Sequence, residues 1–441
     1  MCLRFCILLV LTALFSFLSC DLQAGWQGSC TEFSLRHFES RSSWRKREGR
    51  GQTAKGVQDR IYTKDEISGR LEKLATKLLE PLQTTTTEHI HERVQELFKR
   101  KTYVAAPAGA RKVDGCVKWL ILDQNVSLSV PDNTALAMQT TKPFWRSRLL
   151  WTWDLFRSVA LPNLSIEIAQ CLHDCVQTVR NDSQLAKMPR YVEPVPLPVF
   201  SLIQCRGFSD DIPLPVFEAG RPNPRTIFSS GLNDWDVACA LHGSSAISWA
   251  HRQSKAVFRG SSRKSLESTR ITKKKGRDRM SVYGREALAQ HAHRHSEIFD
   301  VVVTDSSTNC SGRSFMSVRE QTNFKYSIYA EGNCGWADRL WWQMHTPQVV
   351  LKQESLCGLF FEQLMQPFVD HIPCAATFED LSHRVKWLTR HDREALIITT
   401  NAMRFSEAFL VRKAIIEYFE ALLKQYSEIW RKNAQLMCEA R

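Results

Sequence analysis

Several patterns that would indicate other kinds of protein are missing from this chain of 441 residues. None of its 14 cysteines lies in a Cys-x-x-Cys pair, and such pairs are typical of structural zinc sites. No Gly-x-Ser-x-Gly elbow accompanies a histidine and an aspartate in the order of an α/β-hydrolase. The chain also has no internal repeat, which argues against a solenoid. These absences disfavour a zinc module, a serine hydrolase and a repeat protein.

The bulk composition indicates a globular protein with anionic partners. Hydrophobic residues make up 43% of the chain, which is enough to bury a core in each of two ordinary domains. The formal net charge is +13, and such a charge favours nucleotides, acidic glycans, membrane surfaces or nucleic acid. Charge alone does not choose among these partners.

The first 20 residues predict export. Arg4 precedes an uncharged apolar stretch from Phe5 to Ser19, which fits a signal-peptide core better than a membrane span of about 20 residues. We therefore expect a signal peptide over residues 1–20; an uncleaved signal anchor, and with it membrane association, is the alternative. The last residues lack a Lys-Asp-Glu-Leu-type signal. We expect the Golgi or the endoplasmic reticulum, with the Golgi slightly preferred.

Two further features fit the lumen of a secretory pathway. The cysteines are scattered, which in an exported chain favours disulfides over zinc, although spacing does not give their pairing. Asn-x-Ser triplets are glycosylation acceptors in that compartment. They begin at Asn125, Asn163, Asn181 and Asn309.

Changes in composition divide the rest of the chain into four parts. Polar residues 21–63 predict a stem or linker, and residues 64–112 predict a helical extension packed on the body. Short apolar runs then alternate with helical patterns, which indicates an α/β fold. We expect a first lobe over 113–234 and a second over 235–441, which ends in a long amphipathic helix. The proline-rich stretch Val192–Pro224 predicts an irregular connection or an active-site loop.

The residues from Ala256 to Arg263 combine the parts of a phosphate site. A strand pattern runs into a turn with one glycine, two serines and flanking arginines. Gly260 lets backbone N–H groups approach phosphate oxygens, and Ser261 adds a hydroxyl donor. Arg259 and Arg263 can form charge-assisted, bidentate bonds. An ordinary basic turn explains the same composition about equally well.

A second loop in the same half has similar parts. The strand Phe324–Tyr329 leads into a glycine loop from Glu331 to Arg339, where the arginine begins a helix. Ligands gather at the carboxyl ends of strands in parallel sheets. Two arginine loops at one edge could hold a diphosphate without a metal. They would stabilise the negative charge on a departing nucleoside diphosphate.

In their order along the chain, these motifs resemble one known family. Trp249-x-x-Arg-x-x-x-Ala-Val-Phe-Arg-Gly-Ser is followed by the Lys325–Tyr326 strand and its loop. Then come Val349-Val-Leu-Lys-Gln-Glu-Ser and Phe360-Phe-Glu-x-x-Leu-x-x-Pro-x-x-x-His-Ile-Pro. The set is similar to that of the Rumi-type protein O-glucosyltransferases and the fungal capsule-associated xylosyltransferases. The resemblance runs roughly from Phe144 to Tyr426.

The resemblance implies an α/β fold of the GT-B type, with two Rossmann-like lobes, a cleft between them and a C-terminal helix that packs back. It implies an inverting transfer of glucose or xylose from a UDP-sugar to a hydroxyl of a protein or glycan, with no metal or other cofactor. A luminal binding protein that keeps this fold without turnover is the alternative, since Ala337 stands where many members have serine. The residues expected to bind the nucleotide diphosphate are Arg259, Gly260, Ser261, Arg263 and Arg339.

The catalytic base is expected in the first lobe. Inversion in one displacement needs a single carboxylate to take the proton of the attacking hydroxyl. The segment Leu161–Asp174 matches the family's turn and strand with a shift of one or two residues, which makes Asp174 the candidate. Glu167 is the rival, but it lies inside the strand pattern, where we expect a solvated face. Glu354 and Ser355 either face the same cleft or begin a helix.

Other charged or metal-like groups are given lesser roles. Asp234-Trp-Asp236 lies in a helical pattern, Cys171-Leu-His-Asp-Cys175 lacks a second pair, and His291-Ala-His-Arg-His295 is expected on a solvated helix face. The basic run Lys273–Arg279 is expected to be a solvated loop. No aromatic platform accompanies it, and the apolar leader argues against nucleic acid. We therefore expect no metal site and no nucleic-acid partner.

Overall fold

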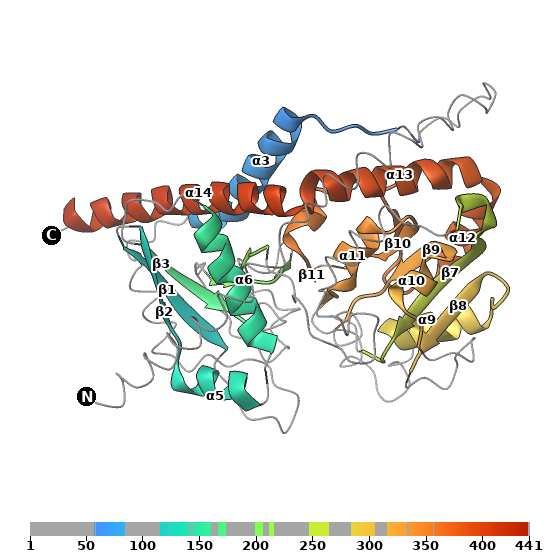
Figure 1. Cartoon of the computed structure of the whole chain (residues 1–441), viewed down its shortest axis with the longest axis horizontal. Coiled ribbons are helices and arrows are strands. Elements are labelled where there is room, and N and C mark those ends of the chain that lie inside the picture. Colours follow the sequence, from blue (N-terminus) through green and yellow to red (C-terminus); the bar gives the residue numbers. More distant parts are fainter. Residues whose placement is uncertain are drawn as a thin grey trace.

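The computed structural model describes residues 57, 59–83, 115–122, 124–140, 142, 144–159, 166–172, 199–205, 211–215, 247–263, 284–304, 315–332, 335–355 and 357–439. Within these ranges the chain forms two five-stranded sheets with helices around them (Figure 1). The α/β class predicted from the alternation of apolar runs is confirmed. The expected signal peptide and most of the expected stem lie outside the described residues.

The second sheet in chain order is wholly parallel, with the strand order β12-β10-β9-β7-β8. Its strands are buried over most of their length, as expected of parallel strands joined through helices. The chain builds outward from β7 to β8 in one direction and from β9 to β12 in the other. The order therefore reverses between β7 and β9. The strands are β7 (Gln253–Gly260), β8 (Phe299–Val303), β9 (Phe324–Tyr329), β10 (Val349–Gln353) and β12 (Ile372–Cys374).

Short helices connect the strands of this sheet. Helix α9 (Gly284–His293) lies between β7 and β8, α10 (Val318–Gln321) precedes β9, and α11 (Arg339–His345) joins β9 to β10. Helix α10 begins with a capping box, in which Ser317 and Glu320 satisfy each other's backbone N–H groups. After β10 come the two-residue strand β11 (Cys357–Gly358) and the 3₁₀ helix η5 (Phe360–Gln363).

The first sheet is mixed, with the strand order β2-β1-β3-β4-β6. Strand β1 pairs antiparallel with β2 and β3, whereas β3, β4 and β6 run parallel. Helices α5 (Asp132–Thr140) and α6 (Phe144–Ser158) lie between β2 and β3 in the chain. The strands are β1 (Cys116–Leu122), β2 (Asn125–Ser129), β3 (Ile166–Cys171), β4 (Val199–Ser201) and β6 (Ile212–Pro213).

The proline-rich stretch contains three short strands, which its sequence did not predict; its residues 192–198, 206–210 and 216–224 lie outside the described part. Strands β4 and β6 of the first sheet and β5 (Gln204–Cys205) all fall within it. Pro213 is accommodated because β6 is a two-residue strand at the edge of the sheet, where a missing backbone donor costs little. The prolines shorten these strands without preventing them.

The last three helices connect the two sheets. Helices α12 (Leu381–Arg390) and α13 (Asp392–Phe409) lie by the second sheet, and α14 (Arg412–Glu439) continues across to the first (Figure 1). Tyr418 donates a hydrogen bond to the Pro213 carbonyl at 2.8 Å, and Tyr426 donates one to the Glu167 carbonyl at 3.0 Å. The C-terminal helix thus packs on a sheet that is distant in sequence.

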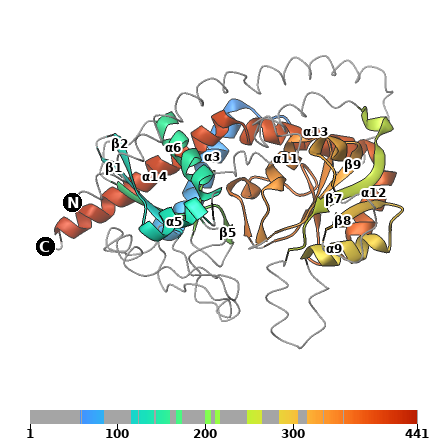
Figure 2. The same cartoon turned by 60° about the horizontal axis from the view of Figure 1, so that its bottom comes forward.

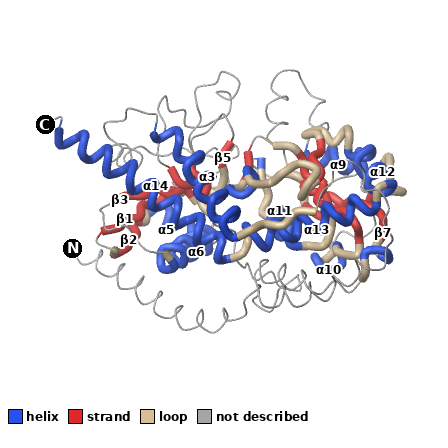
Figure 3. Tube along the Cα trace, turned by 90° about the horizontal axis from the view of Figure 1, so that it is seen from above, coloured by secondary structure: helices blue, strands red, loops and turns tan. Residues whose placement is uncertain are grey.

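Helix α3 (Lys64–Gln83) packs along α14 (Figure 1). Its buried face consists of leucines and one alanine at helical spacing, as the apolar periodicity predicts. Figures 2 and 3 show the strands gathered in two groups, with α14 running past the group formed by the first sheet. No helix in the described ranges is long and apolar enough to cross a bilayer.

Two disulfides are present among the described cysteines. Cys116 and Cys171 are opposite each other on β1 and β3 and are bonded within the first sheet. Cys205 on β5 is bonded to Cys357 on β11, so it ties a segment next to the first sheet to the second half. Disulfides favour an oxidising compartment. The bond at Cys171 also excludes the zinc arrangement imagined for Cys171 and Cys175.

Candidate functional site

The reversal of strand order places β7 beside β9, and this position is where open α/β sheets bind ligands. In such sheets the connections leave the two neighbouring strands in opposite directions, and ligands bind beyond the carboxyl ends of those strands. Strand β7 ends at Gly260 and β9 ends at Tyr329. The two motifs singled out in the sequence follow these strands directly. The topology therefore brings them to one edge.

Arg339 and Gly260 are in contact at this edge. A Cβ atom added to Gly260 would lie 3.1 Å from a terminal guanidinium nitrogen of Arg339. The guanidinium carbon lies 4.4 Å from the centre of the Phe258 ring, a cation–π distance. Among the described residues Arg339 forms no ion pair, and burial lowers its pKa. Its charge is therefore available to an anion at the carboxyl end of β7.

Arg285, on the first turn of α9, is a site residue that the sequence did not reveal. Its guanidinium donates to the carbonyl of Ser261 at 3.0 Å, to that of Glu331 at 3.2 Å and to that of Ala330 at 3.4 Å. One buried side chain thus holds the segments that follow β7 and β9. A Gly-Arg pair at a helix start is a weak signal, and the residues before it, 264–283, lie outside the described part.

The charge around Arg285 is strongly positive. Burial, followed by the charges of Arg339 and Arg263, lowers the pKa of Arg285 to about 9. Asp338 opposes this effect. Three arginines from three separate segments therefore share one region at the end of the sheet. Like charges gathered in this way favour the binding of a polyanion.

The other predicted arginines have different surroundings. Arg259 is buried and donates to the Asp300 carboxylate at 2.6 Å and to the Asp300 carbonyl at 2.8 Å. This ion pair fastens β7 to β8, so its guanidinium is already engaged. Arg263 is exposed and donates to the carbonyl of Ser262. The structure brings Gly260 and Arg339 together directly, and Arg285 binds the carbonyl of Ser261, the next residue.

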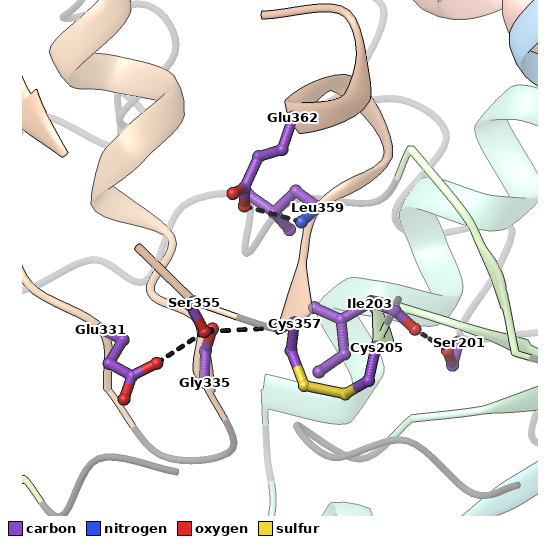
Figure 4. Close-up of a disulfide and its surroundings, with 9 residues drawn as sticks. All are labelled: Ser201, Ile203, Cys205, Glu331, Gly335, Ser355, Cys357, Leu359 and Glu362. Carbon is purple, nitrogen blue, oxygen red and sulfur yellow. Dashed lines mark hydrogen bonds between the residues drawn. A yellow bond between two sulfur atoms is a disulfide. The ribbon is translucent and has the colours of Figure 1, made fainter. Parts of the chain in front are cut away.

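The glycine loop between β9 and α11 is held by Ser355, which lies beside Glu331 and Gly335 (Figure 4). Its hydroxyl donates to the Glu331 carboxylate at 2.6 Å and lies 2.9 Å from the Gly335 carbonyl. Gly335 has a φ of +82°, and a Cβ there would lie 3.1 Å from Ser355 Oγ and from Cys357 Cβ. The Cys205–Cys357 disulfide therefore packs against this loop. Ser355 does not begin a helix, since β11 follows it.

Two predictions about solvated side chains are wrong. Glu167 is 7% exposed and forms an ion pair with Lys118 at 3.1 Å. Lys118 lies on the neighbouring antiparallel strand β1, opposite Ala169 and therefore diagonal to Glu167. His291 is buried against α12, with Nε2 2.6 Å from Ser382 Oγ, and burial lowers its pKa. Its neighbour His293 is exposed as expected.

Several predicted positions lie outside the described residues. These positions include the candidate base, which follows β3 by a few residues, both acids of the Asp-x-Asp pattern and the basic run. They are Asp174, Asp234, Asp236 and Lys273–Arg279. Ala337, where many relatives of the expected family have serine, is buried, and its N–H donates to the Tyr329 hydroxyl at 3.0 Å. This contact uses the backbone of residue 337, so it does not require a serine side chain.

The sequence matches glycosyl transferase family 90 over residues 145–440. Protein O-glucosyltransferase 2 of Danio rerio is 29% identical over 106 residues, which cover 24% of this chain and 21% of that protein. Protein O-glucosyltransferase 3 of Homo sapiens is 22% identical over 242 residues, or 53% of this chain and 43% of that protein. The matches thus span less than half the length of these relatives.

Proposed function

Because the chain belongs to glycosyl transferase family 90, we propose that it transfers a sugar from a UDP-sugar to a hydroxyl acceptor. The observation that carries this proposal is the meeting of Gly260 and Arg339 at the point where the strand order reverses. A glycine allows close approach of an anion, and the arginine supplies charge-assisted donors. The names of the relatives favour glucose as the sugar, with xylose as the second choice.

The proposed reaction is a single displacement at the anomeric carbon. Asp174 takes the proton of the acceptor hydroxyl while its oxygen forms a bond to the anomeric carbon. The bond from that carbon to the diphosphate oxygen breaks, and its electron pair leaves with UDP. Arg339 and Arg263 stabilise the charge that develops on the leaving group. This chemistry is complete without a metal or another cofactor.

The same proposal assigns the two sheets to two lobes of a GT-B architecture. The all-parallel sheet would belong to the donor lobe and the mixed sheet to the acceptor lobe. Asp174, which follows β3 in the sequence, is then the proposed base on the acceptor side. The boundary expected near residue 235 stays a prediction, since 216–246 lie outside the described part. The acceptor is a hydroxyl of a protein or a glycan, met in the lumen of the secretory pathway.

The base assignment is tested by Asp174→Asn. An amide cannot accept the acceptor proton, so we expect transfer from UDP-glucose to fall by at least about 100-fold. UDP binding, measured by calorimetry, should be unchanged. Asp182→Asn, a nearby acid without an assigned role, serves as the matched control. Full activity of the Asp174 variant would remove the assignment.

The donor site is tested by Arg339→Ala. Loss of one preorganised donor at a developing negative charge costs about 3 to 4 kcal/mol in catalysis, so kcat/KM should fall by a factor of several hundred. UDP should also bind more weakly. The control is Arg390→Ala, because Arg390 is an exposed arginine at the end of α12 in the same half. Equal activities of the two variants would refute the proposed donor site.

A further inference from the structure

A polar pocket of about 460 Å³ lies beside the glycine loop, at the ends of β10 and β12. This volume is within the usual range of small-molecule sites. Ser355 forms part of its wall and also bonds the loop that precedes Arg339. Lys77 reaches the pocket from α3. Its other polar residues are Lys352, Glu354, Glu362, Gln363 and His371.

His371 lines this pocket, and one of its ring nitrogens is held by a buried carboxylate. The residue is 6% exposed, and its Nδ1 lies 2.8 Å from the carboxylate of Asp370, which is fully buried. That carboxylate also accepts the backbone N–H of Gln366. In the neutral ring, a carboxylate beside Nδ1 selects the tautomer with hydrogen on Nδ1, which leaves Nε2 as an acceptor. Among the described residues no group hydrogen-bonds to Nε2.

A buried ion pair places a hydrogen-bond donor in the same pocket. Lys352 Nζ lies 2.9 Å from the Glu362 carboxylate, and both residues are less than 8% exposed. The second oxygen of Glu362 accepts the N–H of Leu359 at 2.8 Å, a contact drawn in Figure 4. These bonds fix donors and acceptors on the wall before any ligand arrives. Preorganisation of this kind lowers the entropy lost on binding.

The mixture of groups narrows the ligand class. Lys77 and Lys352 balance the charges of Glu354 and Glu362, so the wall as a whole does not favour a phosphate or another anion, and its polar groups do not suit an apolar molecule. A sugar ring carries several hydroxyls, each of which both donates and accepts, so it matches alternating carboxylate, imidazole, amide and ammonium groups. A hydroxyl can donate to Nε2 of His371 and another can accept from Lys352.

We propose that this pocket binds a saccharide ring through its hydroxyls, with His371 Nε2 accepting a hydrogen bond from one of them. The inference rests on the proposed function only in naming the molecule that carries the sugar ring. It belongs either to the donor, whose diphosphate would lie on the adjoining loop, or to a glycan acceptor. Asp370 is then a positioning residue, because it acts through His371.

The test replaces His371 with phenylalanine, which keeps a ring but removes the acceptor. The control is His383→Phe, since His383 is exposed on α12. UDP and UDP-glucose are titrated by calorimetry, and methyl β-glucoside by saturation-transfer NMR. If the donor sugar occupies the pocket, UDP-glucose should bind at least about tenfold more weakly while UDP is unchanged. If a glycan acceptor does, UDP-glucose is unchanged and binding of the glucoside is lost.

Glu354→Ala provides a second variant for the case in which the His371 variant does not fold. Glu354 is exposed at the pocket rim, so its removal should leave folding intact and weaken the same ligand several-fold. The pocket assignment is overturned if UDP, UDP-glucose and the glucoside all bind folded variants within twofold of the control. Failure of wild-type protein to bind UDP would instead count against the proposed function, and the glucoside titration would still test the pocket.

Discussion

The two sheets differ in how their strands are joined. Every pairing in the second sheet is parallel, so each connection crosses back over the sheet and all carboxyl ends meet at one edge. The first sheet contains antiparallel pairings around β1, and a disulfide fastens β1 to β3. The topology of the parallel sheet therefore gathers the residues that follow its strands at one edge. In the mixed sheet the carboxyl ends of β1 and β3 lie at opposite edges.

The largest expected effect is the loss of stability when either disulfide is removed. Replacing Cys116 and Cys171 by serine frees a loop with a sequence separation of 55, and replacing Cys205 and Cys357 frees one of 152. Chain entropy alone predicts losses of about 4 and about 5 kcal/mol in the free energy of unfolding. Denaturant unfolding measures both.

Nucleotide binding then separates the roles of the two bonds. The Cys205–Cys357 bond supports the loop that presents Arg339, so its loss should weaken UDP binding several-fold under conditions where the variant is folded. Loss of the Cys116–Cys171 bond should leave UDP binding unchanged. An equal effect of both variants on UDP affinity would contradict this division of labour between the sheets.

The sequence predicted the second sheet more closely than the first. Runs such as Val349–Leu351 are apolar and lie between helical patterns, which is characteristic of buried parallel strands. Strands β4 and β6 escaped prediction because they are short and lie among prolines. Strand β4 pairs with β3 and β6 pairs with β4, and pairing of this kind is not local information.

The next largest effect concerns the glycine loop. Gly335→Ala forces a side chain into a left-handed backbone position and against Cys357 and Ser355, so we expect a loss of about 1 to 3 kcal/mol in stability. UDP affinity should fall with it. The matched control is Gly69→Ala in α3, where no atom lies within 4 Å of the added Cβ. That change should stabilise the helix by about 1 kcal/mol.

Thermal unfolding with and without UDP measures both alanine variants. A Gly335 variant as stable as the wild type would show that the disulfide and Ser355 do not constrain the loop. A stabilising effect at Gly69 alone would leave the comparison between the sheets unchanged, because α3 packs mainly along α14.

The smallest effect is a pH dependence of UDP binding at Arg285. Its pKa is lowered to about 9, so the charged form is disfavoured in the free folded protein, and this penalty declines as pH rises through 9. Below pH 9 the charge is present and attracts a diphosphate. Above pH 9 binding requires proton uptake, and the affinity should fall by up to about tenfold per pH unit.

Arg285→Met provides the reference for this titration. It should bind UDP more weakly at pH 7.5 and show a shallower decline between pH 8 and 10. Uracil also ionises in alkaline solution, so the difference between the two proteins, measured by calorimetry, is the relevant quantity. Parallel curves would exclude Arg285 from the positive cluster.

The candidate site was predictable where it followed a strand directly. Gly260 ends β7, Ser261 follows it, and Arg339 lies in the segment after β9; parallel pairing brings such residues together. Arg259 lies inside β7, and its partner Asp300 is 41 positions away, so sequence could not reveal that it was engaged. Arg285 and the Asp370–His371 pair depend on contacts between elements whose relative placement local patterns do not specify.

The Cys205–Cys357 bond also has a consequence for biosynthesis. Cys116 and Cys171 can pair while the second half is still on the ribosome, but Cys205 waits for a partner much later in the chain. The sequence separation of Cys205 and Cys357 is 152, which at ~5–20 residues per second is about 8 to 30 s of synthesis. Throughout that interval the native partner of Cys205 has not been made, so Cys205 is open to pairing with the wrong cysteine. Packing of the glycine loop against Cys357 is therefore a late folding event that a disulfide isomerase would accelerate.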